Sequence, residues 1–169
     1  MKIDDLIARA EIMDVLHRYC RAVDRGDVEE LRAVYHPGAT DHHGGFTGLG
    51  EDFAPYIVEK MDAAVLHGQH YITNAIIELD GDEARVESYF LAIQPYTSAG
   101  GANQLGFIGG RYLDHFAHRD DRWAIAARTV VMDWSRESLP GDEWRGHVNY
   151  PRPGRREADP SHGFFTAIR

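Results

Sequence analysis

Residues 4–27 read DDLIARAEIMDVLHRYCRAVDRGD, and this stretch decides how the rest of the chain is interpreted. Apolar side chains recur in it at steps of four, three and four residues, which is one face of a helix with 3.6 residues per turn. The positions that follow this spacing are Ile12, Leu16, Tyr19 and Val23. Gly26 then supplies the glycine that ends many helices, so the pattern predicts a helix over residues 4–25.

Two more helices and a short strand are predicted next. Asp27 is a good N-cap and Glu30 follows it at capping-box spacing, so a second helix begins there. The run His36-Pro37-Gly38 is expected to end that helix. Residues 39–48 read as a short strand with a turn or bulge at two glycines, and residues 51–66 repeat apolar side chains at helical spacing.

The second half of the chain predicts two hairpins. The expected strands are residues 69–79, 83–97, 104–118 and 122–134. The first pair flanks the turn sequence Asp80-Gly81-Asp82, and the second pair flanks residues 119–121. Helices followed by long antiparallel strands indicate an α+β fold, in which a strongly curved sheet wraps the first helix and leaves a cavity at its open end.

Composition excludes several classes of protein. The 169 residues suffice for one domain with a core of its own, and the net charge of −9 disfavours nucleic acid as a partner. No run approaches the ~20 apolar residues that cross a bilayer, so no membrane partner is expected. The single cysteine, Cys20, permits no intrachain disulfide and fits a reducing, cytoplasmic location.

We expect one domain over residues 1–135 and an irregular C-terminal extension over residues 136–169. The extension is rich in proline, glycine and charge, which is typical of irregular structure. Its arginines Arg152, Arg155 and Arg156 are interpreted as a solvated loop, since runs of charge usually face water. The extension could wrap the domain or a partner subunit.

Asp24 and His70 are the candidate reactive residues. Asp24 lies beside the apolar face of the first helix, and a carboxylate at a helix C-terminus opposes the helix dipole. His70 opens the first long strand, and histidine is the usual general base near neutral pH. The alternatives are a solvent-exposed Asp and one structural His among the ten of the chain.

No metal or cofactor is expected. His42 and His43 are adjacent and therefore point to opposite sides of a strand, which does not suit a shared metal with His67 or His70. There is no G-x-S-x-G motif, and Cys20 lies in the middle of a helix on its apolar face.

Several motifs in order resemble the SnoaL-like branch of the nuclear transport factor 2-like superfamily, over residues 1 to about 135. The matching runs are Tyr19–Asp27 (YCRAVDRGD), His70–Asn74 (HYITN), Gly109–Phe116 (GGRYLDHF), Trp123–Ile125 (WAI) and Val131–Trp134 (VMDW). The resemblance implies a cone-shaped α+β barrel. Within the superfamily the pattern is similar to scytalone dehydratase, bile acid 7α-dehydratase and hexachlorocyclohexane dehydrochlorinase.

The resemblance implies that the protein is a cofactor-independent lyase. Those enzymes pair an Asp near the end of the first helix with a His on the strand after the third helix, and the roles map onto Asp24 and His70. A Tyr five residues before the Asp contributes to the dehydratase pocket, and Tyr19 matches it. The bile acid enzyme carries an Arg late in the last strand, where this chain has Met132 in our alignment.

The leading hypothesis is a dehydratase for a small, apolar, ring-containing hydroxy-carbonyl compound. Candidate pocket walls are Phe53, Ile57, Met61, Phe107, Met132 and Trp134. One alternative is a ketosteroid-isomerase- or cyclase-like enzyme that shuttles a proton on a strand carboxylate such as Asp133. Another is a non-catalytic ligand-binding or assembly module of the same fold. Large apolar residues on both faces of the long strands predict a homodimer or higher homo-oligomer.

Overall fold

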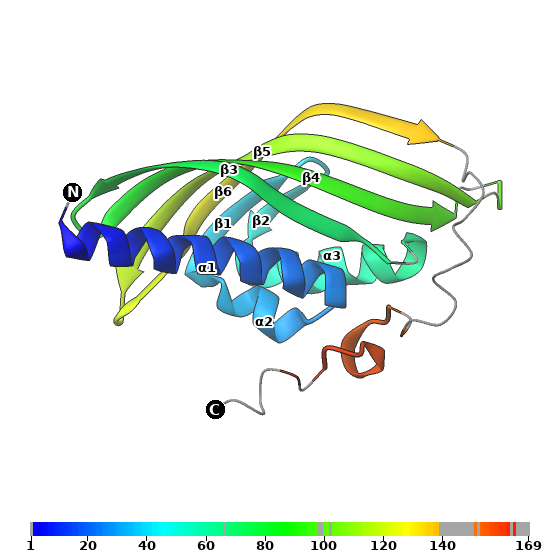
Figure 1. The fold of residues 1–169 in the computed structure, drawn as a ribbon, viewed down its shortest axis with the longest axis horizontal. Coiled ribbons are helices and arrows are strands. Elements are labelled where there is room, and N and C mark those ends of the chain that lie inside the picture. Colours follow the sequence, from blue (N-terminus) through cyan, green and yellow to red (C-terminus); the bar gives the residue numbers. More distant parts are fainter. Residues whose placement is uncertain are drawn as a thin grey trace.

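The computed structural model describes residues 2–65, 67–97, 100–101, 103–138, 151, 153–162 and 164. The elements are α1 (Ile3–Arg25), α2 (Val28–Ala33), β1 (Tyr35–His43), β2 (Phe46–Leu49), α3 (Gly50–Ala64), β3 (Gln69–Asp80), β4 (Glu83–Thr97), β5 (Asn103–Arg119), β6 (Arg122–Ser138) and a short 3-10 helix (Arg156–Ala158). The predicted α+β class is correct, with the helices first and the long strands after them (Figure 1).

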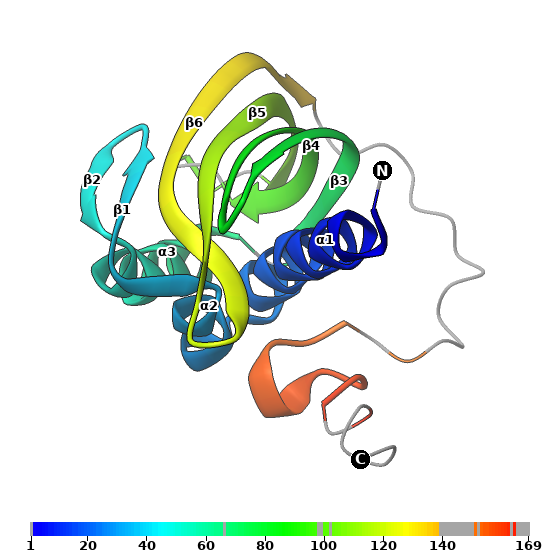
Figure 2. The same cartoon turned by 90° about the vertical axis from the view of Figure 1, so that its left-hand side faces the viewer.

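The six strands form one curved sheet in the order β2-β1-β6-β5-β4-β3. Neighbouring strands are antiparallel except β1 and β6, which run parallel. The sheet bends around α1 (Figure 2), and register shifts in β3 and between β5 and β6 mark places where a strand bulges. Among the described strands β2 and β3 remain as edges, so the expected barrel is an open, strongly curved sheet.

The core lies between the concave face of the sheet and the helices. Alternation along β4 places Ala84, Val86, Ser88, Phe90 and Ala92 inward, all of them buried. Ile12 and Leu16 of α1 are fully buried against this face, as the helical spacing predicts. α1 therefore lies in the hollow of the sheet, and its C-terminal end is held near the start of β3.

Two boundaries differ from the sequence prediction. Residues 36–38 do not end α2, because β1 already begins at Tyr35. The single strand expected over residues 39–48 is a hairpin of β1 and β2, turned at Gly44 and Gly45. Asp27 caps α2 as expected, with its side chain accepting the Glu30 N–H at 3.0 Å.

Part of the C-terminal extension packs on the domain. Residues 153–162 lie beside the ends of α1 and α3 (Figure 1). The solvated-loop interpretation is wrong for Arg155, whose side chain is only 12% exposed and forms an ion pair with Asp62. Arg152 and residues 139–150 lie outside the described residues. Within the part of the chain that is described, no helix is both long and apolar enough to span a bilayer.

Candidate active site

Asp24 is presented to the interior by the last turn of α1. The helix ends at Gly26, whose φ of +70° is the left-handed conformation that favours glycine. Gly26 donates to the carbonyl of Val23 and Asp27 donates to that of Ala22, so two of the last carbonyls are satisfied locally. The carboxylate of Asp24 is thereby directed toward the first residues of β3.

His70 holds that carboxylate at two points. Its ring Nδ1 lies 2.6 Å from Oδ1 of Asp24, and its backbone N–H donates to Oδ2 at 3.0 Å. A carboxylate accepts hydrogen bonds, so the ring proton belongs on Nδ1 and Nε2 is left with its lone pair. The side chains are only 10% and 11% exposed, which keeps the pair in a partly dehydrated environment.

Gln94 lies beside Nε2 of His70, and Met61 lies beside Gln94. The amide nitrogen of Gln94 lies 3.5 Å from His70 Nε2 and 3.9 Å from the sulfur of Met61. Gly68 leaves room beside them, because a β-carbon built there would lie 3.1 Å from Met61 Cε and 3.7 Å from Asp24 Oδ1. α1, α3, β3 and β4 thus each contribute a residue to the immediate surroundings of the Asp24–His70 pair.

A second polar centre lies deeper in the sheet, at Arg128. Its guanidinium donates to both oxygens of Asp114 at 2.7 Å, and both side chains are 0% exposed. The rings of Tyr19 and Tyr112 lie on it, each centroid 4.1 Å from its central carbon. Asp41 of β1 is the register partner of Arg128, so one arginine lies between two aspartates on adjacent strands.

This second centre retains unused hydrogen-bonding capacity. Within the described residues, Nη1 of Arg128 and Oδ1 of Asp41 are buried without a hydrogen-bond partner. The other oxygen of Asp41 accepts from the Tyr35 hydroxyl at 2.6 Å, and His43 Nδ1 lies 3.5 Å from Oδ1. Buried donors and acceptors are normally satisfied, so these two atoms stand out among the described residues.

The sequence analysis missed Arg128 and Asp114. The available signal was one charged residue in register with the apolar, inward positions of each of two strands that pair with each other. Tyr19 belongs to this centre: it makes no hydrogen bond to Asp24 or His70 among the described contacts, and its ring contacts Arg128.

Burial controls the protonation of the groups between the two centres. It raises the pKa of the Tyr19 phenol well above its usual value, so this hydroxyl remains a proton donor at neutral pH. Burial also raises the pKa of the Cys20 thiol to about 12, which removes it as a thiolate nucleophile. Of the groups discussed, this leaves His70 Nε2 as the basic atom, with the Gln94 amide 3.5 Å from its lone pair.

The predicted pocket walls divide between the two faces of the sheet. Phe53 and Met61 are buried on the inner side, Ile57 packs against the core, and Met132 is an inner-face residue with more than half of its surface exposed. Phe107 and Trp134 are corrections. Phe107 shares the face of Gln69 and Ile93, opposite to His70, and the Trp134 ring covers the outer side of Gly109.

Asp133 also points away from the interior. It accepts two hydrogen bonds from Arg111 on the outer face, each 3.0 Å long, so it is not an inward carboxylate for proton shuttling. The inward acid of these strands is Asp114. Within the described part of the chain, no three His, Cys, Asp or Glu side chains gather as metal ligands would.

Solved structures share this fold. The hexachlorocyclohexane dehydrochlorinase of Novosphingobium barchaimii matches with a TM-score of 0.73 and 23% identity, over 84% of this chain and 97% of that one. A scytalone dehydratase-like protein of Novosphingobium aromaticivorans matches with a TM-score of 0.71 and 22% identity, over 86% and 100%. At these identities the likeness shows the fold alone.

Sequence comparison identifies the family of the chain, which the structural likeness does not. An uncharacterized protein of Mycobacterium tuberculosis is 27% identical over 131 residues, which cover 76% of this chain and 87% of that protein. The SnoaL-like domain family matches residues 4–129, from the start of α1 to the Arg128 region of β6. Because that match spans most of the chain and both polar centres, the protein belongs to the SnoaL-like domain family.

Proposed function

We propose that this protein is a cofactor-independent lyase of the dehydratase type, with His70 as its base and Asp24 as the residue that orients it. The observation that carries the proposal is the two-point hydrogen bond between these residues, at 2.6 and 3.0 Å. It fixes the tautomer of His70 and leaves Nε2 as the proton acceptor. The dehydrochlorinase and dehydratase names of the structural neighbours agree with elimination chemistry.

The reaction can be written with these groups. His70 Nε2 takes a proton from a carbon next to a carbonyl, the C–H electron pair becomes a C=C bond, and the C–O bond of the neighbouring hydroxyl breaks. The imidazolium returns its proton to the departing oxygen, which leaves as water, and His70 is neutral again. The carboxylate of Asp24 stabilises the imidazolium in between, as a third group orients the base in other catalytic dyads and triads.

We assign the activating carbonyl oxygen of the substrate to Nη1 of Arg128. Negative charge develops on that oxygen as the proton leaves, and a fixed buried donor stabilises it more than water would. Arg128 is held in place by Asp114 and by the rings of Tyr19 and Tyr112, so its free nitrogen does not have to reorganise. Tyr19, which we expected to assist the leaving hydroxide or to polarise the carbonyl, acts in this proposal by packing on Arg128.

The test is a panel of small ring-containing β-hydroxy-ketones, scored by mass spectrometry for loss of water. On a substrate so found, His70→Gln is expected to lower kcat by a factor of about 10²–10⁴, the usual contribution of a general base. Asp24→Asn is expected to give a similar loss, and Asp133→Asn is the matched control because Asp133 lies on the outer face. Loss of turnover in Asp133→Asn alone would favour the isomerase-like alternative and refute the dehydratase.

A further inference from the structure

The C-terminal segment is bound to the helix end that carries Asp24. We propose that Arg155 is a positioning residue for Asp24: it ties the last turn of α1 to α3, so that the carboxylate stays aligned with His70. The inference rests on the proposed function of the Asp24–His70 pair. It assigns a role to an extension that lies beyond the part of the chain matched by the family.

The contacts of Arg155 join two helices. Nη1 donates to the carbonyls of Val23 and Asp24, at 3.4 and 3.3 Å, and Nε lies 2.6 Å from Oδ1 of Asp62 in α3. Its position at the C-terminal end of α1 is where a helix dipole favours a cation. Asp24 is therefore held through its side chain by His70 and through its backbone by Arg155.

Gly26 makes this approach possible. A β-carbon at Gly26 would lie 2.7 Å from Nη2 of Arg155 and 3.1 Å from the central carbon of the guanidinium. Any other residue at this position would push the guanidinium away from the carbonyls, in addition to the strain of φ +70°. Gly26 therefore both ends α1 and leaves the space that the Arg155 guanidinium occupies.

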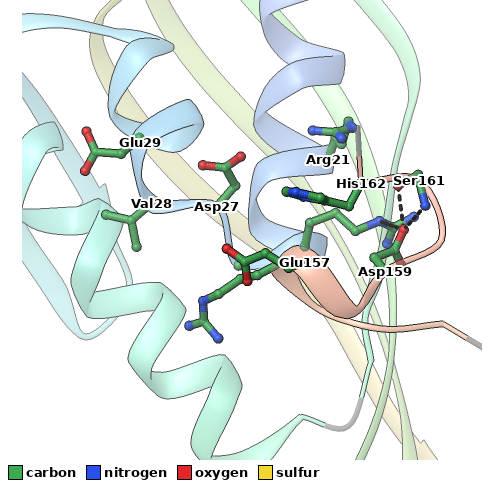
Figure 3. A pocket seen from close by; sticks show the side chains of 11 residues that line it. Arg21, Asp27, Val28, Glu29, Glu157, Asp159, Ser161 and His162 are labelled. Atoms are coloured by element: carbon green, nitrogen blue, oxygen red, sulfur yellow. Dashed lines mark hydrogen bonds and ion pairs between the residues drawn. The ribbon is translucent and has the colours of Figure 1, made fainter. Parts of the chain in front are cut away.

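The segment itself is anchored to the domain again after Arg155. Asp159, which is buried, accepts the backbone N–H groups of Gly154 and Ser161 and lies 3.2 Å from Nε of Arg25 in α1. Figure 3 shows Asp159 and Ser161 facing the end of α1, beside a pocket of about 220 Å³ between the segment and the α1–α2 turn. Arg156 adds an ion pair to Asp62.

Asp62 is ionised at neutral pH, which keeps its ion pairs with Arg155 and Arg156 in place. Burial raises the pKa of its carboxyl, but the hydrogen bond from Arg156 and the charge of Arg155 outweigh that, and the pKa is lowered overall. Without Arg155, the Asp24 carbonyl would lose its partner in the segment, and the last turn of α1 would be free to fray. A displacement of about 1 Å of an orienting group can cost roughly 100-fold in rate.

The experiment compares Arg155→Ala with the neighbouring Arg156→Ala in the full chain. Both variants remove one arginine that pairs with Asp62, but only Arg155 reaches the α1 carbonyls. Two quantities are measured: kcat and KM on the substrate from the panel, and the NMR signal of the His70 Nδ1–H, which needs no turnover. We expect Arg155→Ala to lower kcat about 10–100-fold with little change in KM, and to shift or broaden the His70 proton signal.

The other variants separate positioning from folding. Arg156→Ala is expected to keep the wild-type kcat and His70 signal. Arg155→Lys is expected to recover part of both, because a single ammonium can reach the α1 carbonyls or Asp62 but not both. Thermal unfolding of each variant shows whether the domain remains folded. Wild-type kcat and an unchanged His70 signal in a folded Arg155→Ala protein would overturn the inference while leaving the His70 result untouched. If Arg155→Ala shifts the His70 signal but His70→Gln keeps its turnover, the positioning inference stands and the proposed function is overturned.

Discussion

The two faces of the β5–β6 pair carry the same chemical pair in different surroundings. On the inner face, Arg128 and Asp114 are bonded twice at 2.7 Å, and neither side chain is exposed. On the outer face, Arg111 and Asp133 are bonded twice at 3.0 Å with 29% and 34% exposure. Both are bidentate arginine–aspartate pairs on the same two strands, so the difference between them is the difference in hydration.

That difference decides what each pair can do. The inner pair has lost its water, and its cation is packed between two tyrosine rings, so its charge is fixed and acts through a low dielectric. The outer pair shares Arg111 with Glu87 at 3.3 Å and remains in contact with solvent, which screens it. Only the inner pair can therefore place a preorganised positive charge inside the fold.

The largest expected effect follows from removing one partner of the inner pair. Arg128→Met leaves Asp114 as a buried carboxylate without its counter-charge, and loss of one partner of a buried pair typically costs about 3–5 kcal/mol. The measurement is the free energy of unfolding in urea. Replacement of both partners, Arg128→Met with Asp114→Leu, is expected to restore most of that loss. A single variant as stable as the wild type would mean that the inner pair is hydrated.

The second expectation concerns what covers the outer face. Tyr71, Ile76, Tyr89, Leu113 and Trp134 are exposed large hydrophobic residues of β3, β4, β5 and β6. We propose that a second copy of the chain covers this face, which would dehydrate Arg111 and Asp133 and make the outer pair resemble the inner one. Gel filtration with light scattering should give at least twice the 19.1 kDa chain mass, and Trp134→Glu should halve it. A wild-type species of chain mass at micromolar concentration would refute the assembly.

The third effect is smaller. Arg111→Met in the monomeric Trp134→Glu background is expected to change the free energy of unfolding by at most about 1 kcal/mol, because exposed pairs contribute little. The change should shrink further as salt is added. A cost comparable to that of Arg128→Met would show that exposure is not what separates the two pairs.

Much of the fold could be predicted because local patterns and core packing agree. The spacing from Ile12 to Val23 found α1, and the turn at residues 80–82 found the β3–β4 hairpin. Asp24 and His70 stood out because each is a costly choice at its position, and the structure brings them together across 46 positions of the chain. Their catalytic role remains a proposal.

The rest could not be predicted because it depends on which face a strand residue occupies. A shift of register between Gly109 and Gly110 lets Met132 face inward and Trp134 outward, although simple alternation puts both on one face. With Met132 facing inward, alternation alone does place Asp133 on the outer face, where it pairs with Arg111. The contact of Arg155 with Asp24 joins residues 131 positions apart, and no local pattern predicts such a contact.

The smallest effect is the order in which the two aspartates titrate. Hydrogen bonds from Arg111 lower the pKa of Asp133, while burial raises the pKa of Asp114 against the opposing charge and hydrogen bonds of Arg128. Carbon-13 NMR of the carboxyl groups should therefore show Asp133 titrating below the ordinary value of about 3.9 and Asp114 above it. Arg111→Met should return Asp133 toward that value, as the matched control.

The two shifts have opposite consequences for stability. Since the folded-state pKa of Asp133 is lowered, its contribution is present above about pH 4 and is lost as the pH falls through the lowered pKa. Since the pKa of Asp114 is raised, its contribution is present in acid and is lost as the pH rises from about 3.9 through the raised pKa. As the pH falls from neutral, Asp114 should therefore take up a proton before Asp133 does, and acid should reduce stability through Asp133 alone of the two. Two carboxyl groups that titrate together would show that both faces are equally hydrated, and the comparison between them would fail.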